Sequence, residues 1–220
     1  MIVCKHISKT FPTHTKALQD VSIHIKKGEY VALIGKSGSG KSTMLNIIGL
    51  IDTPTEGEVY INGKMVCKTT EKEKAGIRNS EMGYVFQSFF LEKAYTVYKN
   101  VEMPLLIADV PKKERKKLVQ ESLDKVGLLH KEKELAKNLS GGEQQRVSIA
   151  RALVNNPNII LADEPCGNLD SENTENIMRI FEELNRDGKT IVLVTHSKEE
   201  ADRARRKIAL KDGRIVDNEV

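Results

Sequence analysis

The sequence predicts an α/β fold with a parallel core sheet, on two observations. After Pro157 the chain runs in the order strand, helix, strand, which is typical of a parallel sheet. The runs 159–162 and 190–194 are apolar, and the segment between them has apolar side chains at helical spacing: Ile177, Ile180, Phe181 and Leu184. The other observation is the apolar run 30–34, which leads into a glycine-rich loop and a helix-like segment at 43–48. Such a loop between strand and helix is suited to binding phosphate.

The first third of the chain is predicted to be rich in strands. Val21, Ile23 and Ile25 alternate with polar residues, as in a half-buried strand. Residues 57–61 and 64–66 flank Asn62-Gly63, the residue pair that favours a tight hairpin turn.

Between residues 92 and 155 the pattern becomes helical. Val119, Leu123 and Val126 fall on one helix face, and the set Val147, Ala150 and Val154 follows a similar spacing. We expect one nucleotide-binding domain over residues 1–220. Its core and β-subdomain are assigned to residues 1–91 and 155–220, and an inserted α-helical subdomain to residues 92–154.

The composition indicates a soluble chain that folds without disulfides. Hydrophobic residues make up 39% of the 220 residues, and 35 basic against 31 acidic residues give a net charge of +4. This balance gives no strong nucleic-acid footprint, so no nucleic acid is expected as a partner. Three cysteines without a C-x-x-C pair indicate a reducing cytosol. The basic stretches 112–117 and 203–207 are expected on solvated helix faces, with an anionic membrane surface as the alternative.

The glycine-rich loop matches the pattern G-x-x-x-x-G-K-[ST]. Glycines allow a tight turn in which successive N–H groups converge on phosphate oxygens. We expect Lys41 to reach the β and γ phosphates of ATP and the Ser42 hydroxyl to hold Mg²⁺. The whole segment is predicted to contact the nucleotide: Gly35, Lys36, Ser37, Gly38, Ser39, Gly40, Lys41, Ser42 and Thr43. The alternative, a flexible loop with a chance lysine, does not explain the strand and helix around it.

Two carboxylates end the apolar run 159–162. Asp163 is placed to bind Mg²⁺, directly or through water, and Glu164 to orient the water that attacks the γ phosphate. An acidic exit from a strand is the alternative interpretation.

Leu139-Ser140-Gly141-Gly142-Glu143 followed by Gln144-Gln145-Arg146 resembles the signature motif of the ATP-binding cassette (ABC) ATPases. The resemblance implies a P-loop NTPase of the ABC-ATPase fold, with a parallel core sheet, an antiparallel β-subdomain and an inserted α-helical subdomain. It also implies a head-to-tail homodimer in which Ser140, Gly141 and Gly142 face the γ phosphate of ATP bound to the other subunit.

Four further positions are similar to functional residues of that family. Gln87 resembles the glutamine that binds Mg²⁺ and senses the membrane partner, and Asp170 belongs to a segment that resembles the D-loop. His196 resembles the switch histidine at the γ phosphate, which makes it catalytic together with Glu164. Phe11 stands where an aromatic ring stacks on adenine; a place in the N-terminal core is its alternative.

Two residues depart from the family pattern. Glu143 replaces a frequent glutamine of the signature, which the family tolerates. Cys166 stands where threonine is usual, and because a thiol is a poorer hydrogen-bonding group than a hydroxyl, the position of the D-loop could differ slightly.

The resemblance extends to the macrolide-export and lipoprotein-release branch, with relatives that export bacteriocins or protect against antimicrobial peptides. It implies an ATPase at the cytoplasmic face of the cell membrane, bound through an integral membrane permease subunit. The expected role is to power export or membrane extraction of a peptide, a lipid-linked compound or an amphipathic drug. An alternative is a regulatory clamp on a cell-envelope or division partner that moves no solute. A soluble DNA-repair or translation ABC protein is disfavoured, because there is neither a long coiled-coil insertion nor a second cassette.

Aromatic residues concentrate just after Gln87. Phe89, Phe90, Tyr95 and Tyr98 are four of the ten Phe and Tyr residues in the chain. In the family this region receives a cytoplasmic helix of the membrane subunit. We therefore predict that at least one of Phe89, Phe90 and Tyr95 is exposed; the alternative is that they pack inside the helical subdomain.

Overall fold

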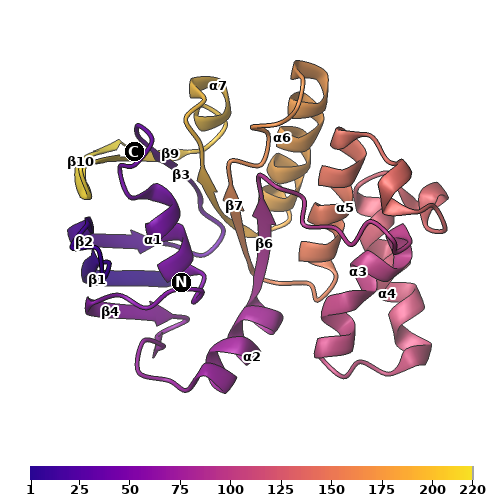
Figure 1. The fold of residues 1–220 in the computed structure, drawn as a ribbon, viewed down its shortest axis with the longest axis horizontal. Helices are drawn as coiled ribbons and strands as arrows, with labels where there is room; N and C mark the ends of the chain where they lie inside the picture. The colour runs from indigo at the N-terminus through magenta and orange to yellow at the C-terminus, as the bar shows by residue number, and fades with distance from the viewer. Residues whose placement is uncertain (220) are drawn as a thin grey trace.

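Two β-sheets enclose the helix that follows the phosphate loop, α1 (Lys41–Ile48). The computed structural model describes residues 1–219. In Figure 1, α1 lies between the antiparallel strands at the left and the core sheet at the centre. Its buried side chains are Lys41, Met44, Leu45, Ile47 and Ile48.

The core sheet has six strands in the order β10-β9-β3-β8-β7-β6. Every neighbouring pair is parallel except the terminal hairpin of β9 and β10. The strands are β3 (Tyr30–Ile34), β6 (Met82–Phe86), β7 (Ile159–Asp163), β8 (Thr190–Val194), β9 (Arg206–Lys211) and β10 (Arg214–Glu219). The parallel sheet predicted from the order of elements is confirmed.

The smaller sheet is antiparallel, in the order β2-β1-β4-β5. Its strands are β1 (Ile2–Thr10), β2 (Lys16–Ile25), β4 (Glu56–Ile61) and β5 (Lys64–Met65). The hairpin predicted around Asn62-Gly63 is confirmed: Ile61 pairs with Lys64, and both turn residues have positive φ.

The remaining helices lie on either side of the core sheet. They are α2 (Glu71–Glu81), α3 (Val97–Ile107), α4 (Lys112–Lys125), α5 (Gly141–Leu153), α6 (Ser171–Arg186) and α7 (Lys198–Ala201), with short 3-10 turns at Leu129–Lys131 and Ala136–Asn138. Helices α3 to α5 lie at the opposite end of the molecule from the antiparallel sheet (Figure 1). They share one hydrophobic cluster with the core strands and α6, so these helices pack directly on the core.

Strand register brings the predicted motifs to one edge of the core sheet. Phe86 lies opposite Asp163, and Asp163 lies opposite Val194. Because parallel strands end at the same edge, the residues that follow them lie close together. That edge therefore carries Gln87 after β6, Glu164 after β7 and His196 beyond β8.

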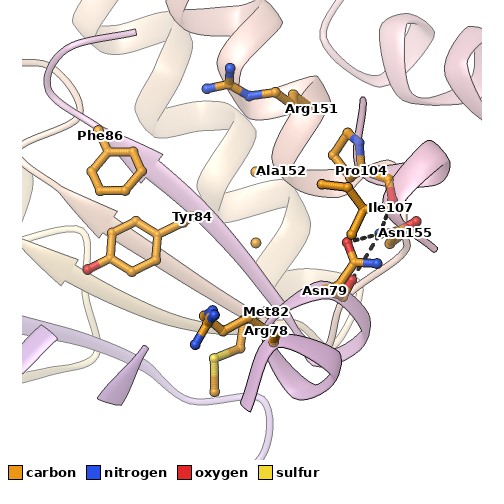
Figure 2. A pocket seen from close by; sticks show the side chains of 12 residues that line it. Arg78, Asn79, Met82, Tyr84, Phe86, Pro104, Ile107, Arg151, Ala152 and Asn155 are labelled. Atoms are coloured by element: carbon orange, nitrogen blue, oxygen red, sulfur yellow. Dashed lines mark hydrogen bonds between the residues drawn. The ribbon is translucent and has the colours of Figure 1, made fainter. Parts of the chain in front are cut away.

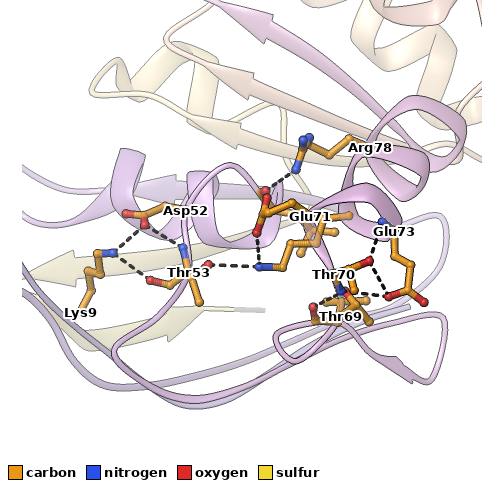
Figure 3. A network of polar contacts seen from close by, with 11 residues as sticks. Lys9, Asp52, Thr53, Thr69, Thr70, Glu71, Glu73 and Arg78 are labelled. Atoms are coloured by element: carbon orange, nitrogen blue, oxygen red, sulfur yellow. Dashed lines mark hydrogen bonds and ion pairs between the residues drawn. The ribbon is translucent and has the colours of Figure 1, made fainter. Parts of the chain in front are cut away.

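A polar network ties the loop after α1 to α2, as Figure 3 shows. Lys9 pairs with Asp52 at 2.6 Å, and the Lys74 ammonium group lies 3.3 Å from the Thr53 hydroxyl and 2.8 Å from Glu71. Arg78 donates to the Leu50 carbonyl at 2.7 Å. These contacts thus fix the position of α2 relative to the segment that follows α1.

The prediction for the second basic stretch was wrong. Residues 203–207 lie in the turn after α7 and at the start of β9, not on a solvated helix face. Arg203 pairs with two glutamates of α6, and Arg206 pairs with Glu29 at 2.6 Å. These cross-element ion pairs, together with the pairing of β9 to β3, determine the conformation. The first stretch lies on α4 and is largely exposed, as predicted.

No helix in the described part of the chain is both long and apolar enough to cross a bilayer.

Candidate functional site

The phosphate loop is held in shape by its own lysine. Lys41 is only 5% exposed, and its ammonium group donates to the carbonyls of Gly35 at 2.8 Å and Lys36 at 3.0 Å. The Ser39 hydroxyl is buried in the same loop without a hydrogen-bond partner. A positive charge and an unsatisfied donor in a glycine-rich loop at the start of a helix form a site suited to phosphate oxygens.

Gly35 shows why the loop requires glycine. Its φ is +149°, and a Cβ atom there would lie 2.2 Å from the Leu210 carbonyl oxygen and 2.7 Å from the Ser39 hydroxyl. Any side chain would collide with the backbone of β9, which is not a flexible neighbour. The loop is therefore pressed against a strand that lies far away in the sequence.

Ser42 and Asp163 meet at the end of the loop. The Ser42 hydroxyl donates to an Asp163 carboxylate oxygen at 3.0 Å. Burial raises the pKa of Asp163, and the hydrogen bond from Ser42 opposes this shift. Hydroxyl and carboxylate oxygens are the donors that Mg²⁺ prefers, so these residues fit the predicted cation.

Glu164 and His196 form a contact at the same edge. Nδ1 of His196 lies 3.2 Å from a carboxylate oxygen of Glu164, and the Glu164 N–H donates to the Val194 carbonyl at 2.9 Å. Glu164 has a φ of +46°, a conformation that costs free energy for a residue with a side chain. The strained backbone aims this carboxylate out of the strand direction, toward the loop between Val194 and Ser197.

A hollow of about 520 Å³ lies between the phosphate loop and the turn that carries His196. Its lining residues include Gly35, Lys36, His196, Ser197 and Lys198. The loop and the histidine therefore face a common space.

The signature residues begin helix α5. Ser140 is the N-cap: its hydroxyl accepts from the Glu143 N–H, and the Glu143 carboxylate accepts from the Ser140 N–H at 2.9 Å. Gly142 packs so closely on α6 that a Cβ atom would lie 1.9 Å from the Asn173 side-chain oxygen. Ser140 and Gly141 are exposed, and α5 lies on the helical side of the molecule, away from α1 (Figure 1). The signature and the phosphate loop are thus kept apart within one chain.

Asp170 and Phe11 have different surroundings. Asp170 caps α6, because its carboxylate accepts from the Asn173 N–H at 2.8 Å, and this bond lowers its pKa. Phe11 is half-buried and belongs to neither hydrophobic cluster, and the Lys9 ammonium group lies 5.2 Å from its ring centroid. The alternative that Phe11 fills the N-terminal core is therefore wrong.

Gln87 is exposed beside the D-loop. The backbone carbonyl of Gln87 accepts from the Asn168 side chain at 3.2 Å. Gly167, which has no side chain, leaves room for the side-chain amide of Gln87.

Gln145 is a residue that sequence reasoning missed. It is fully buried, and its amide nitrogen donates to the Phe86 carbonyl at 3.1 Å and to the Pro165 carbonyl at 2.6 Å. One side chain of α5 thus touches the residue before Gln87 and the residue after Glu164. The sequence signal was a second glutamine in an otherwise apolar position of the helix.

A groove of about 430 Å³ opens beside these elements. Figure 2 shows Tyr84 and Phe86 on one wall and Pro104 and Ile107 on the other. Arg151 and Ala152 of α5 also line the groove, and Asn155, which follows α5, donates to the Asn79 side chain of α2 at 2.9 Å.

Exposed apolar side chains continue from this groove. Ile107 is 71% exposed, and Phe90 is 67% exposed with its ring edge-on to Phe86 at 5.2 Å. Tyr95 is 43% exposed and Phe89 is half-buried. The prediction that at least one of Phe89, Phe90 and Tyr95 is exposed is confirmed. Arg151 donates to the carbonyls of Phe89 and Phe90, so the segment is held in place although its side chains are exposed.

Comparisons with known proteins give a consistent result. A family described as ABC transporter matches residues 18–167. The lipoprotein-releasing system ATP-binding protein LolD of Aquifex aeolicus (strain VF5) is 49% identical over 199 residues, which cover 90% of this chain and 89% of that protein. The macrolide export ATP-binding/permease protein MacB of Chlorobium luteolum (strain DSM 273 / BCRC 81028 / 2530) is 47% identical over 216 residues, but this chain spans only 32% of its length.

Two solved structures share the fold. The dimeric ABC transporter cassette MJ0796 has a TM-score of 0.92 and 46% identity, with 100% of this chain and 98% of that chain covered. A dimer of the same cassette in a post-hydrolysis state, bound to ADP and Pi, also has a TM-score of 0.92, with 45% identity.

Proposed function

The chain belongs to the ABC transporter family, and on this premise we propose that it is the ATP-hydrolysing subunit of a transporter, working as a dimer beside a membrane-embedded subunit. The observation that carries the proposal is the meeting of Lys41, the Ser42–Asp163 pair and the Glu164–His196 pair at one edge of the core sheet.

The roles follow from the chemistry of each group. Lys41 and the loop N–H groups bind the phosphates, and Gly35 keeps the backbone close to them. Ser42, Asp163 and Gln87 would supply oxygen ligands for Mg²⁺, which would neutralise phosphate charge when bound. Glu164 orients the attacking water, and His196 stands beside it near the γ phosphate.

The separation of the two phosphate-binding elements supports the composite site. Ser140 and Gly141 are exposed at a helix N-terminus, where N–H groups favour an anion, yet they lie far from the phosphate loop of their own chain (Figure 1). A second copy, arranged head to tail, would bring them to the γ phosphate. Asp170 would then lie at the interface between the copies.

The groove supports a docking site for a cytoplasmic helix of the membrane subunit. Its apolar walls and the exposed ring of Phe90 suit helix recognition by aromatic and aliphatic anchors. Gln145 joins the groove strand β6 to the segment after Glu164, which would link docking to hydrolysis. This arrangement would hold the chain at the cytoplasmic face of the membrane.

The relatives favour export or membrane extraction as the work performed. LolD is described as part of a lipoprotein-releasing system and MacB as a macrolide export protein. A lipid-linked, peptide or amphipathic drug substrate is consistent with both descriptions. The substrate would contact the membrane subunit rather than this chain.

ATPase measurements on purified variants test the proposal. Glu164→Gln should keep ATP binding and lose turnover by about 100-fold or more, because the amide cannot accept a proton from water. Lys41→Ala should instead weaken ATP binding, since it removes a charged contact to the phosphates. The matched control is Glu172→Gln, an exposed carboxylate in the first turn of α6, which should behave as wild type. Turnover of Glu164→Gln at the wild-type rate would refute the assignment.

A further inference from the structure

A buried carboxyl group lies behind the catalytic edge, and the mechanism above does not use it. Glu200 in α7 is 8% exposed, and its Oε2 atom is buried without a hydrogen-bond partner. Burial raises its pKa, while a hydrogen bond from the Thr195 side chain and the nearby His196 oppose the shift. Burying such a group costs free energy, so its place calls for an explanation.

Comparison with two other glutamates of this chain shows that Glu200 is not a simple helix cap. Glu73 of α2 and Glu143 of α5 occupy the third helical position and turn back to bond the N–H of their N-cap residue. Glu200 occupies the same position after the N-cap Ser197, but its carboxyl group points into the protein. The Ser197 N–H is bound instead by the Thr195 hydroxyl, at 3.0 Å.

These contacts hold the two residues that flank His196, which are Thr195 and Ser197. Thr195 is 2% exposed; its hydroxyl accepts from the Ser197 N–H and hydrogen-bonds the Glu200 carboxyl group. On the other side, the Glu200 N–H donates to the Ser197 hydroxyl at 3.4 Å. The residue before His196 therefore contacts the Glu200 carboxyl group, and the residue after it accepts from the Glu200 backbone N–H.

The environment beneath Glu200 keeps water out. The Tyr30 hydroxyl is buried and has no hydrogen-bond partner, and the Cys166 thiol is also buried. Burial raises the pKa of Tyr30 and of Cys166, and Glu200 contributes to both shifts. A hydrogen bond between the Thr195 hydroxyl and the Glu200 carboxyl group is stronger in such a buried, low-dielectric surrounding than in water.

We propose that Glu200 is a positioning residue for ATP hydrolysis: through the Thr195 hydroxyl it holds the turn that places His196 3.2 Å from Glu164. The proposal rests on the proposed function. It adds a residue that touches neither nucleotide nor water but sets the geometry of the pair that does.

Steady-state kinetics with a substitution series test it. Glu200→Ala should lower kcat for ATP by about 10-fold or more with less than about a 2-fold change in KM, because misplacing a catalytic group affects the reaction more than binding. Glu200→Gln keeps an oxygen acceptor for Thr195 and should recover most of the lost rate. Thr195→Val should lower kcat as Glu200→Ala does, and the double variant should be no slower than either, since both interrupt one chain of contacts. Glu199→Gln, the exposed neighbour, is the control and should equal wild type.

A structural readout separates this proposal from the proposed function. Crystal structures and imidazole ¹⁵N shifts of the nucleotide-free protein should show His196 displaced from Glu164 in Glu200→Ala and restored in Glu200→Gln. That result stands even if the wild-type chain hydrolyses no ATP, which would overturn the proposed function alone. An unmoved His196 in a folded Glu200→Ala variant, or an unchanged kcat, would overturn the positioning role.

Discussion

At the scale of single residues, Gln145 illustrates how one buried polar side chain can connect separate motifs. Its amide nitrogen bridges two carbonyls that belong to different strand exits, one before Gln87 and one after Glu164. Its own amide oxygen is buried without a partner. Such a group is retained where its hydrogen bonds specify a geometry that apolar packing would leave loose.

Gln145→Ala should lower the free energy of unfolding by about 2–4 kcal/mol, because two buried carbonyls lose their donor and a cavity is left. Urea denaturation of the purified chain measures the change. Gln144→Ala is the neighbouring control; that side chain donates only to the Leu139 carbonyl, and its loss should cost about 1 kcal/mol. Equal costs for the two variants would contradict a special role for Gln145.

The limits of sequence reasoning also appear at this scale. Residues within one loop or motif, such as Lys41 and Ser42, could be assigned from spacing because the chemistry is local. Glu200 and Gln145 could not, because their importance comes from burial and from partners on other elements. Phe11 shows the same limit, since only the folded chain places its ring outside the hydrophobic clusters.

At the scale of elements, the start of α5 is stabilised by an ion pair as well as by its cap. Lys131 bonds the Glu143 carboxylate, and this contact, followed by the N–H and hydroxyl of Ser140, lowers the pKa of Glu143. A glutamine, which is frequent at this position in the family, would keep the cap but lose the pair.

Glu143→Gln should therefore destabilise the chain by about 0.5–1 kcal/mol at pH 7. A carboxyl group whose pKa is lower in the folded than in the unfolded state stabilises the fold above its unfolded pKa, and this stabilisation is lost as the pH falls through the folded value. The difference between variant and wild type should accordingly shrink below about pH 4. Urea titrations at both pH values, with Glu121→Gln of the exposed Lys117 pair as control, measure it; a difference independent of pH would exclude the ion pair as the cause.

The elements themselves were predictable where their periodicity was strong. Strands β3, β7 and β8 are continuous apolar runs, and α6 carries a regular apolar face, so all four were found. Helix α2 was missed because it is almost entirely polar and buries only Lys74. Strands β9 and β10 were missed because the hairpin that they form begins with basic residues. The start of β9 is held by an ion pair between Arg206 and the distant Glu29, which hydrophobic alternation does not reveal.

At the scale of the whole molecule, the groove lined by Tyr84, Phe86, Pro104 and Ile107 is bordered by α2 and α5, and each of these helices is connected to a different functional motif. Helix α2 is bonded through Arg78 to the end of α1, and α5 begins with the signature. A helix docked between them would contact both the phosphate-loop side and the signature side of the chain.

Phe90→Ala should weaken binding of the membrane subunit by about 10-fold or more while leaving ATP affinity within about 2-fold of wild type, because an exposed aromatic anchor contributes to docking and not to folding. The measurement is recovery, from native membranes, of the membrane protein that co-purifies with wild type, alongside ATP binding by the isolated chain. Val216→Ala removes a similarly exposed side chain on β10 and serves as control. Undiminished recovery with folded Phe90→Ala would place the docking surface elsewhere.

The contact between Gly35 and Leu210 has a consequence for biosynthesis. The phosphate loop is formed early in the chain, but its wall is the backbone of β9, about 170 residues later. Domains fold as their segments emerge during synthesis, so a nascent chain that has exposed residues 1–205 holds every predicted ATP-contacting residue and still lacks the strand against which the loop packs. We therefore expect chains that have not yet paired β9 with β3 to bind ATP more weakly than completed chains.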